Sequence, residues 1–157
     1  MVKHFSILTL ALLMTFVIFC ESKTHVRKCP GDLPFPLNVQ IDDCEEMPCS
    51  VTKGTTTHME IQFVALKDET YQIETDILVT VLGIKIPYEL PSGNGNVCKN
   101  LMFEANCPLY AEEDVTFKLE FPIDNNFVET NVKAEVKLKD VEDDVVACYI
   151  VDMKVSK

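Results

Sequence analysis

Apolar and polar residues alternate along most of the chain, which is the pattern of β-strands that bury one face. In one clear run, Met59, Ile61 and Phe63 alternate with Glu60 and Gln62. About seven such strands are expected, and they cover residues 37–41, 55–63, 71–81, 84–90, 115–123, 132–138 and 145–155. No segment keeps an apolar period of 3.6 residues over three helical turns, so the pattern predicts strands and not helices.

Turn-forming residues separate the expected strands, for example at 92–96, 124–126 and 142–144. This pattern predicts a single all-β domain, an immunoglobulin-like β-sandwich of two antiparallel sheets. The chain has no tryptophan, and its cysteines fall mainly in expected loops and at the domain ends. The sheets are therefore not pinned together through their centre as in a conventional immunoglobulin domain, which leaves space for a cavity between them.

The N-terminal segment differs in composition from the rest of the chain. Residues 5–19 are apolar over a length typical of a signal-peptide core, which is short for a membrane span. We expect residues 1–22 to be a removed signal peptide, with cleavage after Cys20 or Ser22. The alternative is an uncleaved membrane anchor, but no basic stop-transfer cluster follows. Residues 23–157 would then form one domain without stable membrane insertion.

Cleavage removes one of the seven cysteines and leaves six, namely Cys29, Cys44, Cys49, Cys98, Cys107 and Cys148. An even set behind a signal peptide is typical of a disulfide framework in an oxidising compartment, where a catalytic thiol is not expected. Many pairings are possible, but Cys44 lies close to Cys49 and Cys98 lies close to Cys107. Two local bridges would leave the remaining two cysteines to join the ends of the domain. No C-x2-C pair occurs, so neither zinc nor another cofactor is expected.

The charge and the polar residues exclude several function classes. The formal net charge is −11 at pH 7, which repels phosphate backbones and argues against nucleic-acid binding. An enzyme is not expected, because His58 falls on the polar face of its strand and the carboxylate clusters lie in turns. Nucleophile and phosphate-binding motifs are missing. We interpret these acidic clusters as solubilising charge. The alternative for residues 142–144 is a weak calcium site, although no EF-hand type of loop surrounds them.

Three motifs resemble a known family. The segment 44–54 (CEEMPCSVTKG) precedes an alternating strand, the segment 83–91 (GIKIPYELP) precedes Cys98, and Cys107 is followed by Pro108. In these motifs and in the order of its six cysteines, the chain resembles the lipid-recognition (ML) domain family, in particular the branch of Niemann-Pick type C2 secreted sterol carriers. The resemblance implies disulfides between the first and sixth, second and third, and fourth and fifth cysteines, in agreement with the spacing.

The resemblance also implies a lipid cavity between the sheets, in which no chemical step takes place. Carried over by position, the ligand-binding residues are Ile86, Tyr88, Ile123, Phe127 and Val128 at the mouth, and Val51, Val132, Val136 and Tyr149 in the deeper walls. Pro87 and Pro122 lack the N–H groups that strand pairing needs. These segments would therefore stay apart and leave their apolar side chains available to a guest.

The implied function is that of a secreted carrier of one sterol or one long-chain, fatty-acid-like ligand. Val136 and Tyr149 stand where vertebrate sterol carriers tend to have tryptophan, so the cavity shape and ligand would differ. The chain has no Asn-x-Ser/Thr sequon, which favours extracellular fluid over the lysosomal lumen. A monomer is expected. Its acidic surface favours handover to an acceptor protein or receptor, or diffusion, over docking on anionic membranes.

Two other functions are compatible with the same fold. An innate-immune module would use the cavity to capture acylated microbial products for a receptor, and a structural or allergen-like protein would have a collapsed cavity. Capture of microbial lipid anions favours a basic rim. Lys85 is the nearest cation expected there, among Glu89, Asp124 and Glu129, so the rim favours transport.

Overall fold

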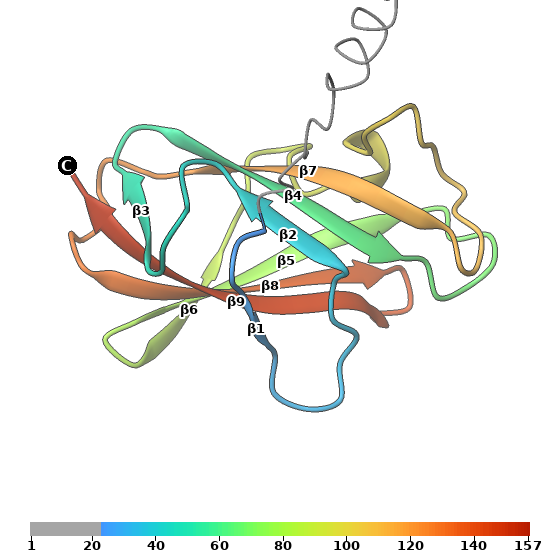
Figure 1. The fold of residues 1–157 in the computed structure, drawn as a ribbon, viewed down its shortest axis with the longest axis horizontal. Coiled ribbons are helices and arrows are strands. Elements are labelled where there is room, and N and C mark those ends of the chain that lie inside the picture. The colour runs from blue at the N-terminus through green and yellow to red at the C-terminus, as the bar shows by residue number, and fades with distance from the viewer. Residues whose placement is uncertain (1–22) are drawn as a thin grey trace, which may run out of the picture.

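The computed structural model describes residues 23–157, and the expected signal peptide, residues 1–22, lies outside the described residues. The described part forms nine strands and the short 3-10 helix η1 (Val97–Lys99) (Figure 1). The strands are β1 (Arg27–Lys28), β2 (Asn38–Ile41), β3 (Cys49–Thr52), β4 (Thr56–Val64), β5 (Ile73–Val81), β6 (Ile84–Tyr88), β7 (Asp114–Pro122), β8 (Asn131–Asp140) and β9 (Val145–Ser156). Within residues 23–157, no helix is long and apolar enough to cross a membrane.

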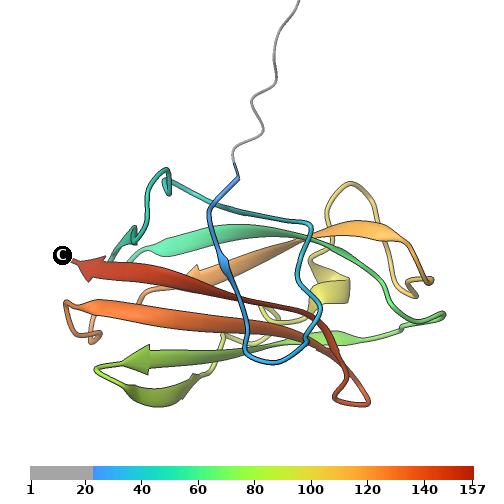
Figure 2. The ribbon, with the colours of Figure 1, turned by 60° about the horizontal axis from the view of Figure 1, so that its bottom comes forward.

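The strands form two sheets that pack face to face (Figures 1 and 2). The larger sheet has the strand order β1-β9-β8-β5-β6, and β3 also pairs with β9. The smaller sheet has the order β2-β4-β7. Neighbouring strands are antiparallel, apart from the short β3, which runs parallel to β9. The predicted all-β sandwich of two antiparallel sheets is confirmed.

The alternation of residue types located the long strands but not two short ones. The expected strands 55–63 and 71–81 correspond to β4 and β5 within one or two residues at each end. Strand β1 has two exposed residues and is too short to show a period. Strand β3 has four residues of alternating burial inside the motif 44–54, and it was not among the expected strands. Both pair with β9, and their pairing therefore depends on the return of the C-terminal strand.

The core lies between the sheets and follows the strand registers. Met59 pairs with Leu119 and Ile61 with Phe117, and all four side chains are buried. Near its start, β9 buries consecutive residues from Val146 onwards, on both faces of the sheet. The N-terminal segment after β1 crosses the outer face of the larger sheet and covers this part of β9 (Figure 2). Because both faces of β9 are covered here, its sequence is a near-continuous apolar run.

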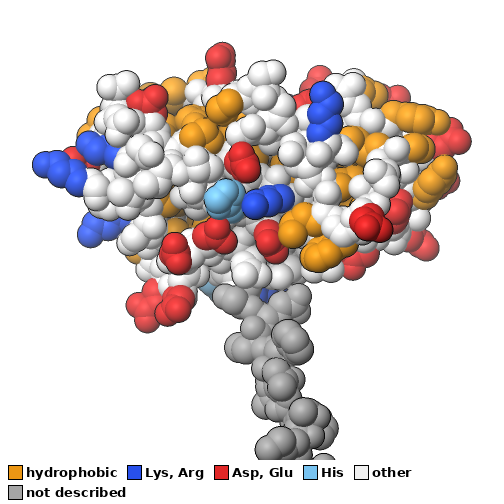
Figure 3. All heavy atoms as spheres, turned by 90° about the horizontal axis from the view of Figure 1, so that it is seen from above, with side chains coloured by type: hydrophobic (Ala, Val, Ile, Leu, Met, Phe, Trp, Pro, Cys, Tyr) orange, Lys and Arg blue, Asp and Glu red, His pale blue; other side chains and the backbone are white. Residues whose placement is uncertain are grey.

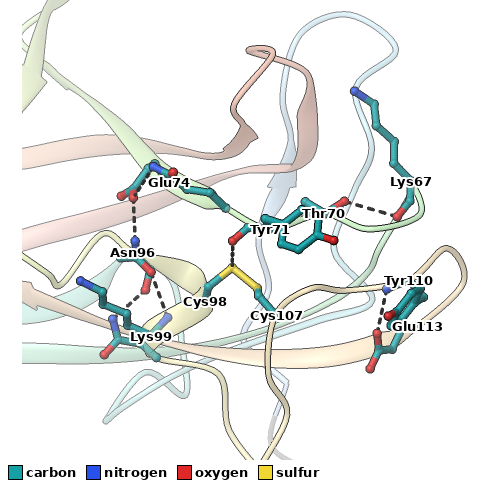
Figure 4. Close-up of a disulfide and its surroundings, with 12 residues drawn as sticks. Lys67, Thr70, Tyr71, Glu74, Asn96, Cys98, Lys99, Cys107, Tyr110 and Glu113 are labelled. Carbon is teal, nitrogen blue, oxygen red and sulfur yellow. Dashed lines mark hydrogen bonds between the residues drawn. A yellow bond between two sulfur atoms is a disulfide. The ribbon is translucent and has the colours of Figure 1, made fainter.

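Three disulfides close the domain with the expected pairing: Cys29–Cys148, Cys44–Cys49 and Cys98–Cys107. The first joins Cys29, the residue after β1, to β9 at a sequence separation of 119. The third holds the loop between β6 and β7, and Figure 4 shows its sulfur atoms beside the Tyr71 carbonyl group. In the same loop, the side chain of Asn96 accepts a hydrogen bond from the Lys99 N–H at the start of η1.

Candidate functional site

An apolar cavity of about 230 Å³ lies between the sheets at one end of the sandwich. Its walls are Val51, Val79, Val81, Ile86, Pro87, Tyr88, Phe121, Ile123, Asn126, Phe127, Val128, Val132, Met153 and Val155. The larger sheet supplies most of the wall, and the smaller sheet contributes through the end of β7 and the loop that follows it. Tyr88 and Asn126 carry the polar side-chain groups of this lining. The site is therefore built to hold an apolar guest.

The cavity opens between β6 and β7, which are the last strands of their sheets on this side. Pro87 in β6 and Pro122 at the end of β7 have no N–H to donate to an opposite strand. The two edges are bridged by a side chain: the Tyr88 hydroxyl donates a hydrogen bond of 2.6 Å to the Pro122 carbonyl oxygen. The Tyr88 ring lies 4.7 Å from the Phe121 ring and 5.8 Å from the Phe127 ring, between centroids.

The cavity residues change from buried to exposed between the inner wall and the mouth. Val51 and Ile123 are almost completely buried, whereas Ile86 is 50% exposed and Val128 is 65% exposed. Tyr88 and Phe127 lie between these extremes and pack against the core. A guest can therefore reach the inner wall past apolar side chains that are already accessible to solvent.

Seven of the nine residues expected to bind a ligand line this cavity, and two lie elsewhere. Val136 and Tyr149 face each other in the β8–β9 register and are buried in the core. Val136 follows Val132 by four residues, which moves it about 13 Å along the strand, beyond the cavity. The Tyr149 hydroxyl contacts Met59 Sδ at 3.3 Å, and burial raises the Tyr149 pKa above its ordinary value. Ile123, expected at the mouth, lies at the inner wall.

Sequence reasoning missed seven wall residues, namely Val79, Val81, Pro87, Phe121, Asn126, Met153 and Val155. Five of them have the inward parity of their strands, which marks them as core but does not distinguish cavity from core. The strand registers make the distinction. Val81 pairs with Val132, and Val132 pairs with Met153, so the three side chains form one row across the larger sheet. The sequence alone does not show that these three residues are neighbours, because this depends on which strands pair.

The mouth carries more acidic than basic groups. Glu89 and Asp124 line the groove that adjoins the cavity at Tyr88. Lys53 forms an ion pair of 2.9 Å with Glu129. Lys85, expected at the rim, instead points its ammonium group towards Glu135 on the outer face of the larger sheet. Burial raises the pKa of Tyr88 above its ordinary value, and the negative charge of Asp124 raises it further.

The carboxylate cluster at the β8–β9 turn contains a lysine. The Lys67 ammonium group contacts Asp140, Glu142 and Asp144 at 2.8, 2.7 and 2.5 Å. The ammonium group therefore occupies the position of the alternative calcium site at residues 142–144, and a metal ion would have to displace it. Its three hydrogen bonds raise the Lys67 pKa. His58 lies on the outer side of the smaller sheet, 3.0 Å from an Asp42 carboxylate oxygen.

The family model of the ML domain matches residues 23–155. The chain belongs to the ML domain family. Its relatives include the mouse NPC intracellular cholesterol transporter 2, which is 22% identical over 147 residues and covers 92% of this chain and 94% of the relative. The NPC intracellular cholesterol transporter 2 homolog a of Drosophila melanogaster is 25% identical over 119 residues, covering 74% of this chain and 77% of the relative.

Two solved structures share the fold. A Niemann-Pick type C2 protein from Japanese carpenter ant superposes with a TM-score of 0.72 at 17% identity, covering 84% of this chain and 99% of the ant chain. Chicken MD-1, in a crystal structure with lipid IVa, superposes with a TM-score of 0.53 at 13% identity, covering 82% and 87% of the two chains. These similarities establish the sandwich architecture. The ligand has to be inferred from the residues of the site.

Proposed function

We propose that the protein is a secreted lipid carrier that binds one sterol or one long-chain, fatty-acid-like molecule between its sheets and performs no chemical step. The observation that carries this proposal is the apolar cavity, which combines a buried inner wall with exposed apolar residues at its mouth. The names of the relatives, which are cholesterol transporters in mouse and fly, support the same class of ligand.

Burial of the ligand supplies enough free energy for useful affinity. Each methylene group removed from water gains about 0.8 kcal/mol, so a chain segment of about eight methylenes gains about 6 kcal/mol before the costs of association. An exposed ion pair at the rim would add at most about 1 kcal/mol. The affinity therefore comes from the cavity, and the charges at the mouth tune the choice of head group.

Innate-immune capture of microbial lipids is a less favoured alternative. Its support is the shared fold with chicken MD-1, whose structure contains lipid IVa. The mouth argues against it, because Glu89 and Asp124 lie beside the cavity and Lys53 is already paired with Glu129. An anionic glycolipid would meet like charge there. We propose transport by a monomer that passes its ligand to an acceptor protein or receptor.

Native mass spectrometry of protein purified from its source, followed by lipid extraction, tests the proposal directly. We expect a ligand-bound mass that converts to the apoprotein mass after extraction, with one sterol or long-chain lipid per chain in the extract. Apoprotein alone, together with no binding of a displaceable lipid probe in solution, would contradict a carrier.

Phe127→Asp tests the assignment of the cavity. The carboxylate would lie in an apolar wall beside the Tyr88 ring, so we expect lipid affinity to fall by at least about 100-fold. Phe103→Asp is the matched control, because Phe103 is 81% exposed and lies outside the cavity lining. Circular dichroism checks that both variants fold. Unchanged binding by folded Phe127→Asp would remove this residue from the site.

A further inference from the structure

Two residues of the cavity lining, Tyr88 and Asn126, carry side-chain groups that can form hydrogen bonds with a ligand. The Tyr88 hydroxyl has one proton, which it donates to the Pro122 carbonyl oxygen over 2.6 Å. Its oxygen keeps lone-pair capacity to accept a hydrogen bond. Asn126 is the other polar residue of the lining, and its amide both donates and accepts, so it does not distinguish between head groups.

A ligand that carries a hydroxyl group suits this arrangement. Its O–H can donate to the Tyr88 oxygen while Tyr88 continues to donate to Pro122, so no existing hydrogen bond is lost. A carboxylate has no proton to donate. It could use Tyr88 only by taking the proton that now bonds Pro122, and the bridge between β6 and β7 would break. Exchanging one hydrogen bond for another gains little, whereas adding one gains affinity.

The charges around Tyr88 also favour a ligand hydroxyl group over a carboxylate. The negative charge of Asp124 is felt at the Tyr88 hydroxyl, where it adds to the effect of burial in raising the pKa. Glu89 lines the same groove, and the ammonium group of Lys53 is engaged by Glu129. A second anion at this point would be repelled, while a neutral hydroxyl would not.

We propose that Tyr88 is a specificity-determining residue that selects lipids with a neutral, hydroxyl-bearing head over lipids with a carboxylate head. The inference rests on the proposed carrier function and narrows it to sterols, long-chain alcohols and acylglycerols. The apolar part of the ligand fills the cavity, and its hydroxyl group lies at the mouth beside the Tyr88–Pro122 bridge.

Three ligands with the same alkyl chain test this inference on delipidated protein. Dodecan-1-ol, methyl dodecanoate and ionised dodecanoate are compared at pH 8 by displacement of the neutral fluorescent probe N-phenyl-1-naphthylamine. In the wild-type protein we expect dodecan-1-ol to bind about tenfold more tightly than dodecanoate. Methyl dodecanoate, which is neutral but has no donor, should bind with intermediate affinity.

Two variants separate the hydrogen bond from the charge. Tyr88→Phe keeps the ring and removes the hydroxyl, so it should weaken dodecan-1-ol about fivefold and abolish its advantage over the methyl ester. Asp124→Asn keeps an oxygen that can accept from the Asn126 N–H, and it should strengthen dodecanoate binding. Tyr110→Phe is the matched control, because Tyr110 is 53% exposed and outside the cavity lining.

The outcomes distinguish the inference from the function on which it rests. Equal or tighter binding of dodecanoate by the wild-type protein would overturn the role of Tyr88 and leave the carrier function intact. The same holds if Tyr88→Phe changes the preference no more than Tyr110→Phe does. If the probe and all three ligands fail to bind the wild-type protein, the carrier function itself is wrong.

Discussion

At the scale of single residues, Asp140 is the most buried acid of the cluster at the β8–β9 turn. Its side chain is 6% exposed, and it accepts hydrogen bonds from Lys67 and from the backbone N–H groups of Glu142 and Asp144. Burial alone would raise the Asp140 pKa. The Lys67 hydrogen bond and the two backbone hydrogen bonds outweigh burial, so the pKa lies below its ordinary value.

Because the pKa of Asp140 is lowered in the folded state, the free energy of unfolding decreases as the pH falls through the acid range. The contribution of Asp140 is fully present above its pKa in the unfolded chain, and it is lost as the pH falls through its lower pKa in the folded protein. We expect Asp140→Asn to lower the Tm by roughly 3 to 6 °C at pH 7. The difference from wild type should shrink once Asp140 is protonated in the folded state.

Thermal unfolding across the acid range checks this prediction. Asp143→Asn is the matched control in the same turn, since Asp143 is fully exposed and its backbone has a positive φ of 64°, which asparagine tolerates well. This variant should change the Tm little at any pH. An Asp140→Asn difference that is the same at pH 7 and in strong acid would show that charge is not its cause.

At the scale of elements, two strand edges that do not pair create the site. Strands β6 and β7 end their sheets on the cavity side, and the Tyr88–Pro122 hydrogen bond connects them. Farther from the cavity, the β7 edge pairs with residues 100–102 through backbone hydrogen bonds, from Met102 to Thr116 and from Lys118 to Asn100. Nearer the cavity, the Asn94 amide lies 3.5 Å from the Glu120 carbonyl oxygen. The gap can therefore widen for a guest by breaking side-chain contacts, without the loss of a strand ladder.

The Cys29–Cys148 disulfide links the residue after β1, the shortest strand, to β9. In the chain-entropy model, a bridge that closes a long loop restricts the unfolded chain most, so its removal should cost about 4 to 5 kcal/mol of unfolding free energy. Removal of Cys44–Cys49, which closes a loop of sequence separation 5, should cost about 2 kcal/mol.

Denaturant unfolding of the two double Cys→Ser variants measures this difference. The Cys44/Cys49 variant serves as the comparison for the Cys29/Cys148 variant, since each loses one bridge and two sulfur atoms. Equal losses of unfolding free energy would show that loop length does not determine the contribution of these bridges, and that local packing around the sulfur atoms does.

At the scale of the whole molecule, the acidic charge is concentrated away from the cavity mouth. The connections 65–72, 103–113 and 141–144 meet at the opposite end of the sandwich. Their acidic residues are Asp68, Glu69, Glu104, Glu112, Glu113, Glu142, Asp143 and Asp144, and their one basic residue is Lys67. Most of the −11 net charge therefore lies at this end. Seen from the smaller sheet, acidic groups also outnumber basic ones (Figure 3).

Ligand binding should stabilise the whole sandwich, because the guest contacts both sheets. A ligand that binds only the folded state at 100 times its Kd adds about 2.7 kcal/mol of unfolding free energy, which corresponds to a Tm increase of about 5 to 10 °C. Differential scanning fluorimetry with dodecan-1-ol measures the increase. At the same ligand concentration, Phe127→Asp should show an increase of at most about 1 to 2 °C. An increase of the same size in that variant would place the ligand outside this cavity.

The sequence predicted the parts of the protein that depend on local pattern. Alternation located the long strands, cysteine spacing and family resemblance gave the disulfide pairing, and the resemblance identified Ile86, Tyr88, Phe127 and Val128 near the mouth. These features are encoded by parity, spacing or motif, which can be recognised without knowing which segments are neighbours. The two-residue strand β1 carries no such signal.

Only the tertiary structure decided where the cavity ends. Val132 and Val136 have the same parity on β8, yet Val132 lines the cavity and Val136 packs in the core. Beside Val136, its partner Tyr149 reaches Met59 of the smaller sheet and fills the space between the layers, whereas the side chains around Val132 leave the cavity open. The Tyr88–Pro122 hydrogen bond joins residues 34 apart in the chain. Parity determines which face a side chain occupies, whereas the separation of the sheets determines whether that face meets another side chain or a guest.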